Sequence, residues 1–180
     1  MPTELRTSRL LLRQWVAADR VPFAKLNADA QVMEHFPALL SKKESDAMAD
    51  YIEAHIEQYG WGFWAVEVSG VAAFAGFIGL AKPLFEAHFT PCTEVGWRLA
   101  VEFWGRGYAS EGAAAALTFG FERLALPEIV SFTVPANLRS RRVMERIGMV
   151  RNPNDDFDHP GLPKGHFLRR HVLYRKTRPG

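Results

Sequence analysis

Two glycines separated by one residue stand directly before a helix-like segment, in the stretch Trp104-Gly105-Arg106-Gly107-Tyr108-Ala109-Ser110. From Ala109 to Leu124, apolar or small residues recur at three- and four-residue spacing, which predicts a helix with a small-residue face suited to close packing on a sheet. Glycine allows a ligand to approach the backbone, and the free N–H groups of a first helical turn attract anions. The stretch therefore predicts a site for a phosphate-bearing ligand.

Two familiar phosphate-binding loops do not fit this stretch. A P-loop requires Lys-Ser or Lys-Thr after its second glycine, and here Tyr108-Ala109 follows Gly107. A dinucleotide-binding fingerprint requires glycine or alanine at position 110, which is Ser110, and an acidic residue at the end of the next strand. The next apolar run, residues 129–134, ends instead on Pro135-Ala136-Asn137. Both alternatives lack residues that their chemistry needs.

The segment 104–109 resembles the pyrophosphate loop of the GNAT superfamily of N-acetyltransferases: Gln or Arg, two variable residues, Gly, one variable residue, then Gly or Ala. Gly107 and Ala109 match, whereas Trp104 departs from the usual first residue. Trp-Gly-x-Gly-Tyr-Ala is the form of the branch that resembles the ribosomal-protein N-terminal acetyltransferases. Residues 137–149 resemble the Asn-x-x-Ser, Val, Gly-Met segment of that branch, and 94–99 resembles the strand before the loop. The resemblance extends over residues 9–175.

The resemblance implies acetyl-CoA as co-substrate and assigns residues to hold it. The pyrophosphate would meet the backbone of the loop, which comprises Trp104, Gly105, Arg106, Gly107, Tyr108, Ala109 and Ser110. The pantetheine arm would pair with the backbone of Leu99, Ala100 and Val101, much as an added strand does. Asn137 is either the N-cap of its helix or an amide that binds the pantetheine chain, or both. Arg142 could reach a coenzyme phosphate, because a guanidinium matches phosphate geometry.

Two residues are candidates for the chemistry of direct acetyl transfer to an amine. Glu94 opens the strand before the loop and could act as general base, although a carboxylate at a strand end is often only solvated. Ser140 lies one turn after Asn137 and matches the position near the leaving sulfur, where its hydroxyl could donate a hydrogen bond. The alternative for Ser140 is a plain helix-surface serine. A non-catalytic acyl-CoA-binding module is the alternative function.

Other polar residues give weaker indications. The six histidines lack metal-ligand spacing, so no metal is expected, and Cys92 is expected to be inert. Asp155, Asp156 and Asp158 could attract a cationic amine or simply solvate a loop. The acceptor walls are expected in the variable segments 29–43, 82–93 and 152–167.

The chain predicts an α/β fold in the order β-α-α-β-β-β-α-β-α-β, and the resemblance implies a mixed, mostly antiparallel sheet flanked by helices. The expected strands are 9–15, 63–68, 74–81, 94–101, 128–134 and 168–176. The expected helices are 19–27, one capped by Ser41 and running through Tyr59, the one after the glycine loop, and 137–147. Gly148 ends the last of these, and residues 152–166 are expected to be a loop.

Length and composition place limits on the class of protein. A chain of 180 residues, with 48% hydrophobic residues and a net charge of +2, predicts one globular domain spanning 1–180 and no nucleic-acid partner. The single cysteine favours a reducing, cytoplasmic location, and no signal peptide or membrane-spanning run is expected. The expected partner is an amine acceptor, on a small molecule or a protein N-terminus. A monomer and a homodimer are both compatible with the sequence.

Overall fold

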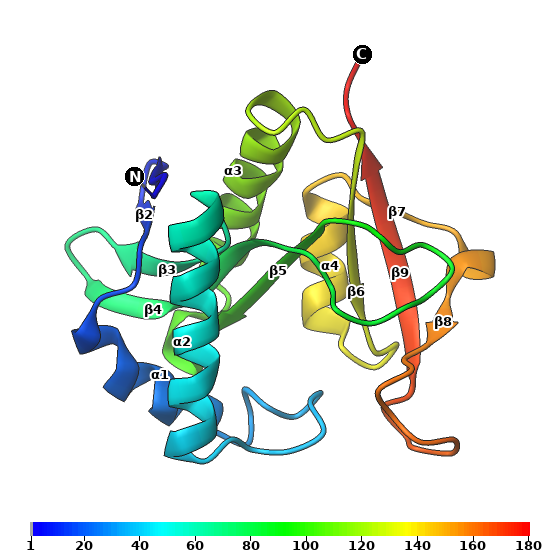
Figure 1. Ribbon diagram of the computed structural model, residues 1–180, viewed down its shortest axis with the longest axis horizontal. Coiled ribbons are helices and arrows are strands. Elements are labelled where there is room, and N and C mark those ends of the chain that lie inside the picture. The colour runs from blue at the N-terminus through cyan, green and yellow to red at the C-terminus, as the bar shows by residue number, and fades with distance from the viewer. Residues whose placement is uncertain (1) are drawn as a thin grey trace.

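The computed structural model describes residues 2–180 and is a mixed α/β fold (Figure 1). Within these residues the strands form one sheet in the order β1-β2-β3-β4-β5-β6-β9-β7, with β8 paired to β9. The strands are β1 Leu5–Arg6, β2 Leu10–Arg13, β3 Phe63–Val68, β4 Ala72–Ala81, β5 Glu94–Leu99, β6 Glu128–Thr133, β7 Val150–Arg151, β8 Phe157–Asp158 and β9 Arg170–Thr177. The helices are α1 Arg20–Asn27, α2 Lys42–Tyr59, α3 Tyr108–Glu122 and α4 Leu138–Arg146, with short 3₁₀ turns at Ala17–Asp19, Val101–Phe103 and Pro153–Asp155. The predicted order of the major elements and the mostly antiparallel sheet are confirmed.

The two strands at the centre of the sheet, β5 and β6, are parallel and separate soon after they meet. They share a single register pair, Glu94 with Val130, whereas β5 pairs with β4, and β6 with β9, over six residues each. Beyond Glu94, the side of β5 that faces β6 therefore has no strand to pair with. This separation leaves room for a ligand in the middle of the sheet.

Helix α3 lies unusually close to the sheet, as its small-residue face predicts. A Cβ atom built on Gly112 would come within 2.6 Å of the Ile78 Cδ1, and one on Gly120 within 2.5 Å of the Ile129 Cδ1. Both distances are shorter than van der Waals contact, so a larger residue at either position would force the isoleucine side chain to shift. The close packing fixes where the first turn of α3 stands relative to β5.

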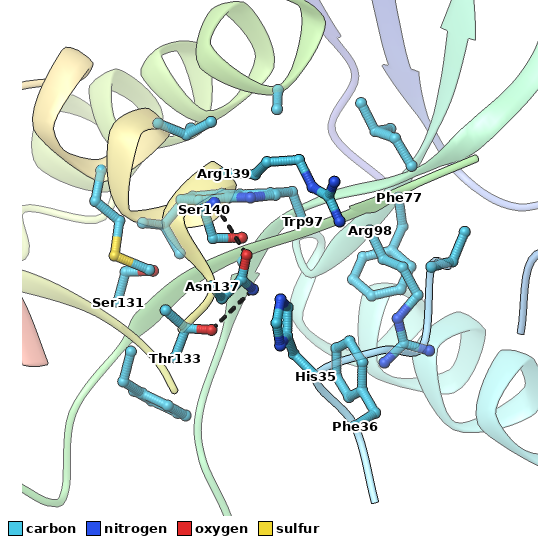
Figure 2. A pocket seen from close by; sticks show the side chains of 18 of the residues that line it. His35, Phe36, Phe77, Trp97, Arg98, Ser131, Thr133, Asn137, Arg139 and Ser140 are labelled. Carbon is cyan, nitrogen blue, oxygen red and sulfur yellow. Dashed lines mark hydrogen bonds between the residues drawn. The ribbon is translucent and has the colours of Figure 1, made fainter. Parts of the chain in front are cut away.

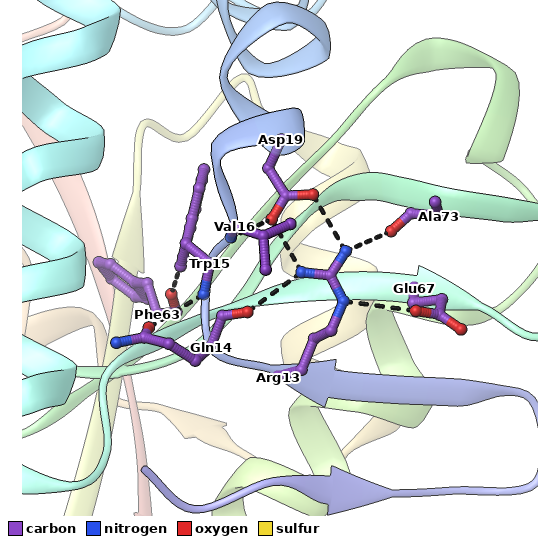
Figure 3. A network of polar contacts seen from close by, with 8 residues as sticks. All are labelled: Arg13, Gln14, Trp15, Val16, Asp19, Phe63, Glu67 and Ala73. Carbon is purple, nitrogen blue, oxygen red and sulfur yellow. Dashed lines mark hydrogen bonds and ion pairs between the residues drawn. The ribbon is translucent and has the colours of Figure 1, made fainter.

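A buried ion pair sets the position of α1 on the opposite face of the sheet (Figure 3). The Arg13 guanidinium at the end of β2 donates to both carboxylate oxygens of Asp19, at 2.8 and 3.0 Å, and to the Ala73 carbonyl oxygen at 2.7 Å. Asp19 also accepts from the Val16 backbone N–H at 2.9 Å. Bidentate pairs of this kind are geometrically specific. The network directs α1 so that its last residue, Asn27, faces β5.

The predicted helix capped by Ser41 is confirmed in detail. The Ser41 hydroxyl accepts from the Glu44 backbone N–H, and the Glu44 carboxylate accepts from the Ser41 N–H at 2.8 Å. Gly60 ends the helix in the left-handed conformation, with φ of +78°. None of the helices in residues 2–180 combines the length and apolar character needed to cross a bilayer.

Several predicted strands begin or end at the wrong residue. The predicted strand 94–101 ends at Leu99, because the Phe103 N–H turns back to the Ala100 carbonyl at 3.0 Å and starts a 3₁₀ turn. The predicted strand 9–15 is shorter, Leu10–Arg13, and the Trp15 indole N–H instead donates to the Phe63 carbonyl at 2.8 Å. The predicted loop 152–166 contains the short strand β8. The small strands β1, β7 and β8 carry too few residues to show periodicity in the sequence.

Candidate active site

A cavity of about 700 Å³ opens where β5 and β6 separate, between the first turn of α3, helix α4 and the segment that joins α1 to α2 (Figure 2). It brings together residues that are far apart in the sequence. Of the predicted site residues, it is lined by Glu94, Leu99, Trp104, Gly105, Gly107, Tyr108, Ala109, Ser110, Asn137, Ser140 and Arg142. Ala100, Val101 and Arg106 do not line it.

The glycine loop presents its backbone as the sequence predicts. Gly105 and Gly107 adopt left-handed φ angles of +71° and +82°, and Gly107 is the N-cap of α3. The first helical bond runs from the Glu111 N–H to the Gly107 carbonyl, so the N–H groups of residues 105–110 have no backbone acceptor among residues 2–180. Trp104 is a correction: its N–H donates to the Val101 carbonyl at 3.0 Å. The amides that are free to meet an anion are therefore those of residues 105–110.

An ion pair outside the motif holds this loop in place. Glu111, in the first turn of α3, accepts hydrogen bonds from the Thr7 hydroxyl at 2.6 Å and the Arg9 Nε at 2.7 Å. Arg9 also donates from Nη1 to the Arg106 carbonyl at 2.9 Å, and its guanidinium lies 4.7 Å from the centre of the Tyr108 ring. The N-terminal strands thus brace the loop through Arg9. Sequence reasoning missed this role, because roughly one hundred residues separate the partners and neither belongs to the loop motif.

The backbone expected to pair with the pantetheine arm is partly occupied within the protein. The Ala100 N–H donates to the Ala75 carbonyl at 3.0 Å, and the Leu99 carbonyl accepts from the Trp104 indole N–H at 2.8 Å. Because Ala100 points its N–H to β4, that of Leu99 points the other way, toward the gap between β5 and β6. The expected pairing is thereby reduced to the N–H groups of Leu99 and Val101. Trp104, which departs from the usual first residue of the loop motif, thus stabilises the turn between β5 and α3 through its indole N–H.

Glu94 has the environment expected of a general base. Its side chain is half-buried and lines the cavity at the point where β5 and β6 meet. Burial alone raises the pKa of its carboxyl to about 7, with no cation or hydrogen-bond donor among residues 2–180 to offset it. A carboxyl with a pKa near neutral pH can both accept and release a proton under working conditions. The sequence predicted Glu94 as a candidate base but gave no sign of this shift in pKa.

Helix α4 supplies the other polar groups of the site. The Asn137 Oδ1 accepts from the Ser140 backbone N–H at 3.2 Å, and its Nδ2 donates to the Thr133 hydroxyl at 3.0 Å (Figure 2). The N-cap interpretation of Asn137 is therefore confirmed, and its amide retains one further donor for a ligand. Ser140 lines the cavity beside it, and Arg142 is exposed at the cavity edge.

Comparison with known proteins decides the family. Residues 9–150 match the model of the acetyltransferase (GNAT) domain. The chain belongs to the GNAT acetyltransferase family. It is 30% identical over 161 residues to the N-acetyltransferase YnaD of Bacillus subtilis, covering 89% of each chain. It is 32% identical over 153 residues to the FsC-acetyl coenzyme A-N(2)-transacetylase of Aspergillus fumigatus, covering 81% of this chain and 64% of that protein.

Solved GNAT structures agree with the fold. An acetyltransferase of this family from Bacillus anthracis superposes with a TM-score of 0.80 at 26% identity, covering 98% of this chain and 99% of that one. RimL, a ribosomal L7/L12 alpha-N-protein acetyltransferase in complex with coenzyme A, superposes with a TM-score of 0.74 at 15% identity, covering 97% and 98%. The second comparison supports the fold alone. Ribosomal-protein acetyltransferases are thus among the structural neighbours, as the motif resemblance implies.

As a GNAT enzyme, the chain depends on acetyl-CoA, and the residues present fit that co-substrate. The free amides of the loop suit a pyrophosphate, and Gly107 leaves open the space in which a side chain would stand. Burial raises the pKa of the Cys92 thiol to about 11, so its reactive thiolate is scarce at neutral pH. Residues 2–180 hold no cluster of three or more His, Cys, Asp or Glu side chains suited to a metal.

On the acceptor side of the GNAT site, one expectation is wrong, and one of the two alternatives for the late aspartates is disfavoured. Segment 82–93 does not line the cavity, because Phe85 and Phe89 pack with Phe132 and Phe157 in a separate aromatic cluster. The three late aspartates are neutralised by arginines: Asp155 by Arg175, Asp156 by Arg151, and Asp158 by Arg169 and Arg170. They are therefore not free to attract a cationic amine.

The structure adds two histidines that sequence reasoning had considered only as metal ligands. His159 and His171 line the cavity with their ring centres 5.2 Å apart. Burial lowers the pKa of both imidazoles and so favours the neutral form of each ring. Spacing in the sequence could not reveal them, because β8 and β9 bring them together only in the folded sheet.

The N-cap role of Asn137 makes a specific prediction. We expect Asn137→Ala to lower the free energy of unfolding by about 1 kcal/mol, because the Ser140 N–H loses its acceptor. Asn137→Asp is the matched control, since a carboxylate still caps the helix. Thermal unfolding followed by circular dichroism should show a fall of roughly 2–4 °C for the alanine variant alone. An unchanged midpoint in that variant would contradict the role.

Proposed function

We propose that this GNAT enzyme transfers an acetyl group from acetyl-CoA directly to an amine, with Glu94 as general base. One observation carries the proposal: the free amides of the glycine loop and the half-buried, unpaired Glu94 carboxyl line the same cavity. Acetyl-CoA supplies the activated acetyl group. The protein would supply its grip, its orientation and an acceptor for the proton that the amine loses.

The other residues have supporting roles in this proposal. The N–H groups of 105–110 would hold the pyrophosphate, and Leu99, Val101 and Asn137 would orient the pantetheine arm. Arg142 would meet a phosphate from the cavity edge. As the amine nitrogen bonds to the acetyl carbon, Glu94 takes the proton from nitrogen and the carbon–sulfur bond breaks. The departing sulfur takes a proton through water, and Ser140 donates a hydrogen bond rather than its own proton, because a serine hydroxyl is a poor acid at neutral pH.

The relatives are named for two different classes of acceptor. One is named for acetyl transfer to N(2) of FsC, and RimL is named for a protein α-amine. Both a small-molecule amine and a protein N-terminus are therefore carried as candidates. The cytoplasmic location, the single domain over 1–180, and a monomeric or homodimeric state stay predictions from the sequence.

Calorimetric titration with acetyl-CoA, CoA and NAD, side by side, tests the cofactor. We expect saturable binding of the two coenzyme A species and none of NAD. The same protein is then mixed with acetyl-CoA and pooled amines and N-terminal peptides, and free thiol is measured. Thiol release that depends on an amine supports transfer. Coenzyme binding without any release would support an acyl-CoA-binding module instead, and binding of NAD would overturn the loop assignment.

A further inference from the structure

Arg98 is a buried cation on the wall of the cavity, and no carboxylate among residues 2–180 pairs with it. Its side chain is only 9% exposed. Burial lowers the pKa of the guanidinium to about 10, so it remains charged at neutral pH. Buried charges in proteins are normally paired, because an unpaired one keeps the full cost of leaving water. An unpaired arginine on a ligand cavity therefore calls for an explanation.

One edge of the Arg98 guanidinium is occupied and the other is not. Nη1 donates to the Asn27 Oδ1 at 2.6 Å and lies 3.9 Å from the Met48 sulfur. Nε is buried without any partner. Arginine binds carboxylates through pairs of parallel N–H groups, and Nε with Nη2 forms one such pair. No residue among 2–180 accepts from this edge, so a carboxylate that enters the cavity can pair with the guanidinium there.

The surrounding residues hold the guanidinium in this orientation. Asn27 and Ser45 are fully buried, and the Asn27 Nδ2 donates to the Ser45 hydroxyl at 2.9 Å, which turns its Oδ1 toward Arg98. The rings of Phe36 and Phe77 lie 4.1 and 5.4 Å from the guanidinium carbon (Figure 2). Aromatic faces stabilise a cation without using its in-plane donors. The arginine is preorganised although no partner fills its open edge.

Arg98 and Glu94 are placed to act on one molecule. Side chains alternate along a strand, so Glu94, Gly96 and Arg98 project from the same face of β5. Four residues at about 3.3 Å each separate the Cα atoms of Glu94 and Arg98 by about 13 Å, and both long side chains can shorten this span. Gly96 lies between them, and the Phe63 ring packs over it, with Cε1 3.1 Å from the position of a Cβ atom. Glu94, Phe63 and Arg98 all line the cavity, so an acceptor can lie along the Phe63 ring with its amine near one group and an anion at the other.

We propose that the acceptor is a small amine that also carries a carboxylate, and that Arg98 binds this carboxylate during acetyl transfer. The inference rests on the proposed function and names its substrate class. It favours an amino-acid-like molecule over a protein N-terminus without an acidic group.

Paired acceptors test the inference. Straight-chain amino acids of increasing length are each compared with the carboxamide of the same amine, by thiol release from acetyl-CoA. We expect kcat/KM to favour at least one carboxylate over its amide by about 100-fold, because a buried polar group left unpaired is strongly discriminating. Arg98→Met should remove this preference and leave the amides unaffected. The exposed Arg123 supplies the control for loss of a positive charge, as Arg123→Met.

A second variant tests the same edge without removing the arginine. Asn27→Asp places a carboxylate where the amide oxygen now lies, 2.6 Å from Nη1, and so gives the cation an internal partner. We expect it to lower kcat/KM for the carboxylate acceptors several-fold while sparing the amides. Equal preference for acids and amides in the parent, or a preference that survives Arg98→Met, would overturn the inference while acetyl transfer itself stands.

Measurements of thermal stability and of product binding test the inference without relying on turnover. If Arg98 serves a ligand, Arg98→Met should change the unfolding midpoint little, because the removal of a desolvated charge offsets the loss of the donor to the buried Asn27 Oδ1. A fall of several degrees would instead indicate a structural arginine. Calorimetric titration of the CoA-saturated protein with N-acetyl amino acids should show binding that Arg98→Met loses. Absence of that binding in the parent would overturn the inference, whereas failure to bind CoA at all would overturn the proposed function.

Discussion

Gly107→Val should weaken the binding of acetyl-CoA at least about 100-fold, a loss of about 2.7 kcal/mol in binding free energy. Gly107 stands at the N-terminus of α3, where the amides of 105–110 point to the expected pyrophosphate. A Cβ atom there would lie 3.4 Å from the Arg9 Nη2, which is ordinary contact, so the folded protein accommodates it. The branched side chain would instead occupy the space of the phosphate. Calorimetry with CoA measures the loss.

Backbone strain must be separated from this loss of binding. Gly107 has φ of +82°, a conformation that costs a residue with a side chain roughly 1–2 kcal/mol. Gly165 has the same φ, and a Cβ atom there meets nothing within 4 Å, so Gly165→Val reproduces the strain away from the loop. We expect both variants to unfold at lower temperature than the parent and Gly107→Val alone to lose CoA. Equal CoA affinity in the two would rule out the loop assignment.

Glu94→Gln should lower kcat by about 10²–10⁴, the range of general base catalysis. The amide cannot take a proton from the acceptor amine, while its size preserves the cavity. In the parent, kcat/KM should show a step near pH 7, where the carboxyl ionises, in addition to the rise that comes with deprotonation of the amine. In the variant this step should disappear, and the residual rate should continue to rise with pH as more of the amine loses its own proton. Glu102→Gln, an exposed carboxylate after β5, is the control.

Glu94→Gln should also raise the stability of the folded protein at neutral and alkaline pH, although it lowers activity. The pKa of Glu94 is raised in the folded protein to about 7 from an ordinary value near 4.5, so the folded state binds the proton more tightly than the unfolded state. Its contribution is therefore favourable below pH 4.5, is lost between pH 4.5 and 7, and leaves a buried charge above pH 7. Glu94→Gln should stabilise the protein above pH 7 by up to about 3 kcal/mol and by little at pH 5.

Thermal unfolding across this pH range checks the stability effect, at roughly 2–4 °C for each kcal/mol. We expect the variant to be less active but more stable than the parent at pH 8, because the Glu94 carboxylate serves activity while it lowers the free energy of unfolding. Unchanged turnover with an unchanged pH profile would show that Glu94 is not the base. In that case the neutral histidines on the cavity, His159 and His171, become the next candidates.

Local patterns in the sequence predicted most of the elements and the position of the glycine loop at the start of α3. The periodic small residues after Ala109, the capping box at Ser41 and the N-cap at Asn137 each depend on neighbours within a few positions, so their physics is readable without the fold. The same is true of the left-handed glycines at 105 and 107, whose motif resembles a known loop. The predicted strand ends are less accurate. The strand predicted to reach Val101 stops at Leu99, because a 3₁₀ turn begins where the apolar pattern still continues.

Only the tertiary structure decides which side chains lie together in the site and what their protonation and charge pairing are. Arg9 braces the loop through Glu111, and Asn27 orients Arg98, across sequence separations that no local pattern spans. The raised pKa of Glu94 comes from burial, and burial depends on how β5 and β6 separate beneath the helices. Hydrogen bonding and periodicity act along the chain, whereas desolvation and charge pairing depend on whatever the fold brings near. The position of the glycine loop could therefore be predicted from the sequence. The unpaired state of Arg98, from which we infer a carboxylate-bearing acceptor, could not.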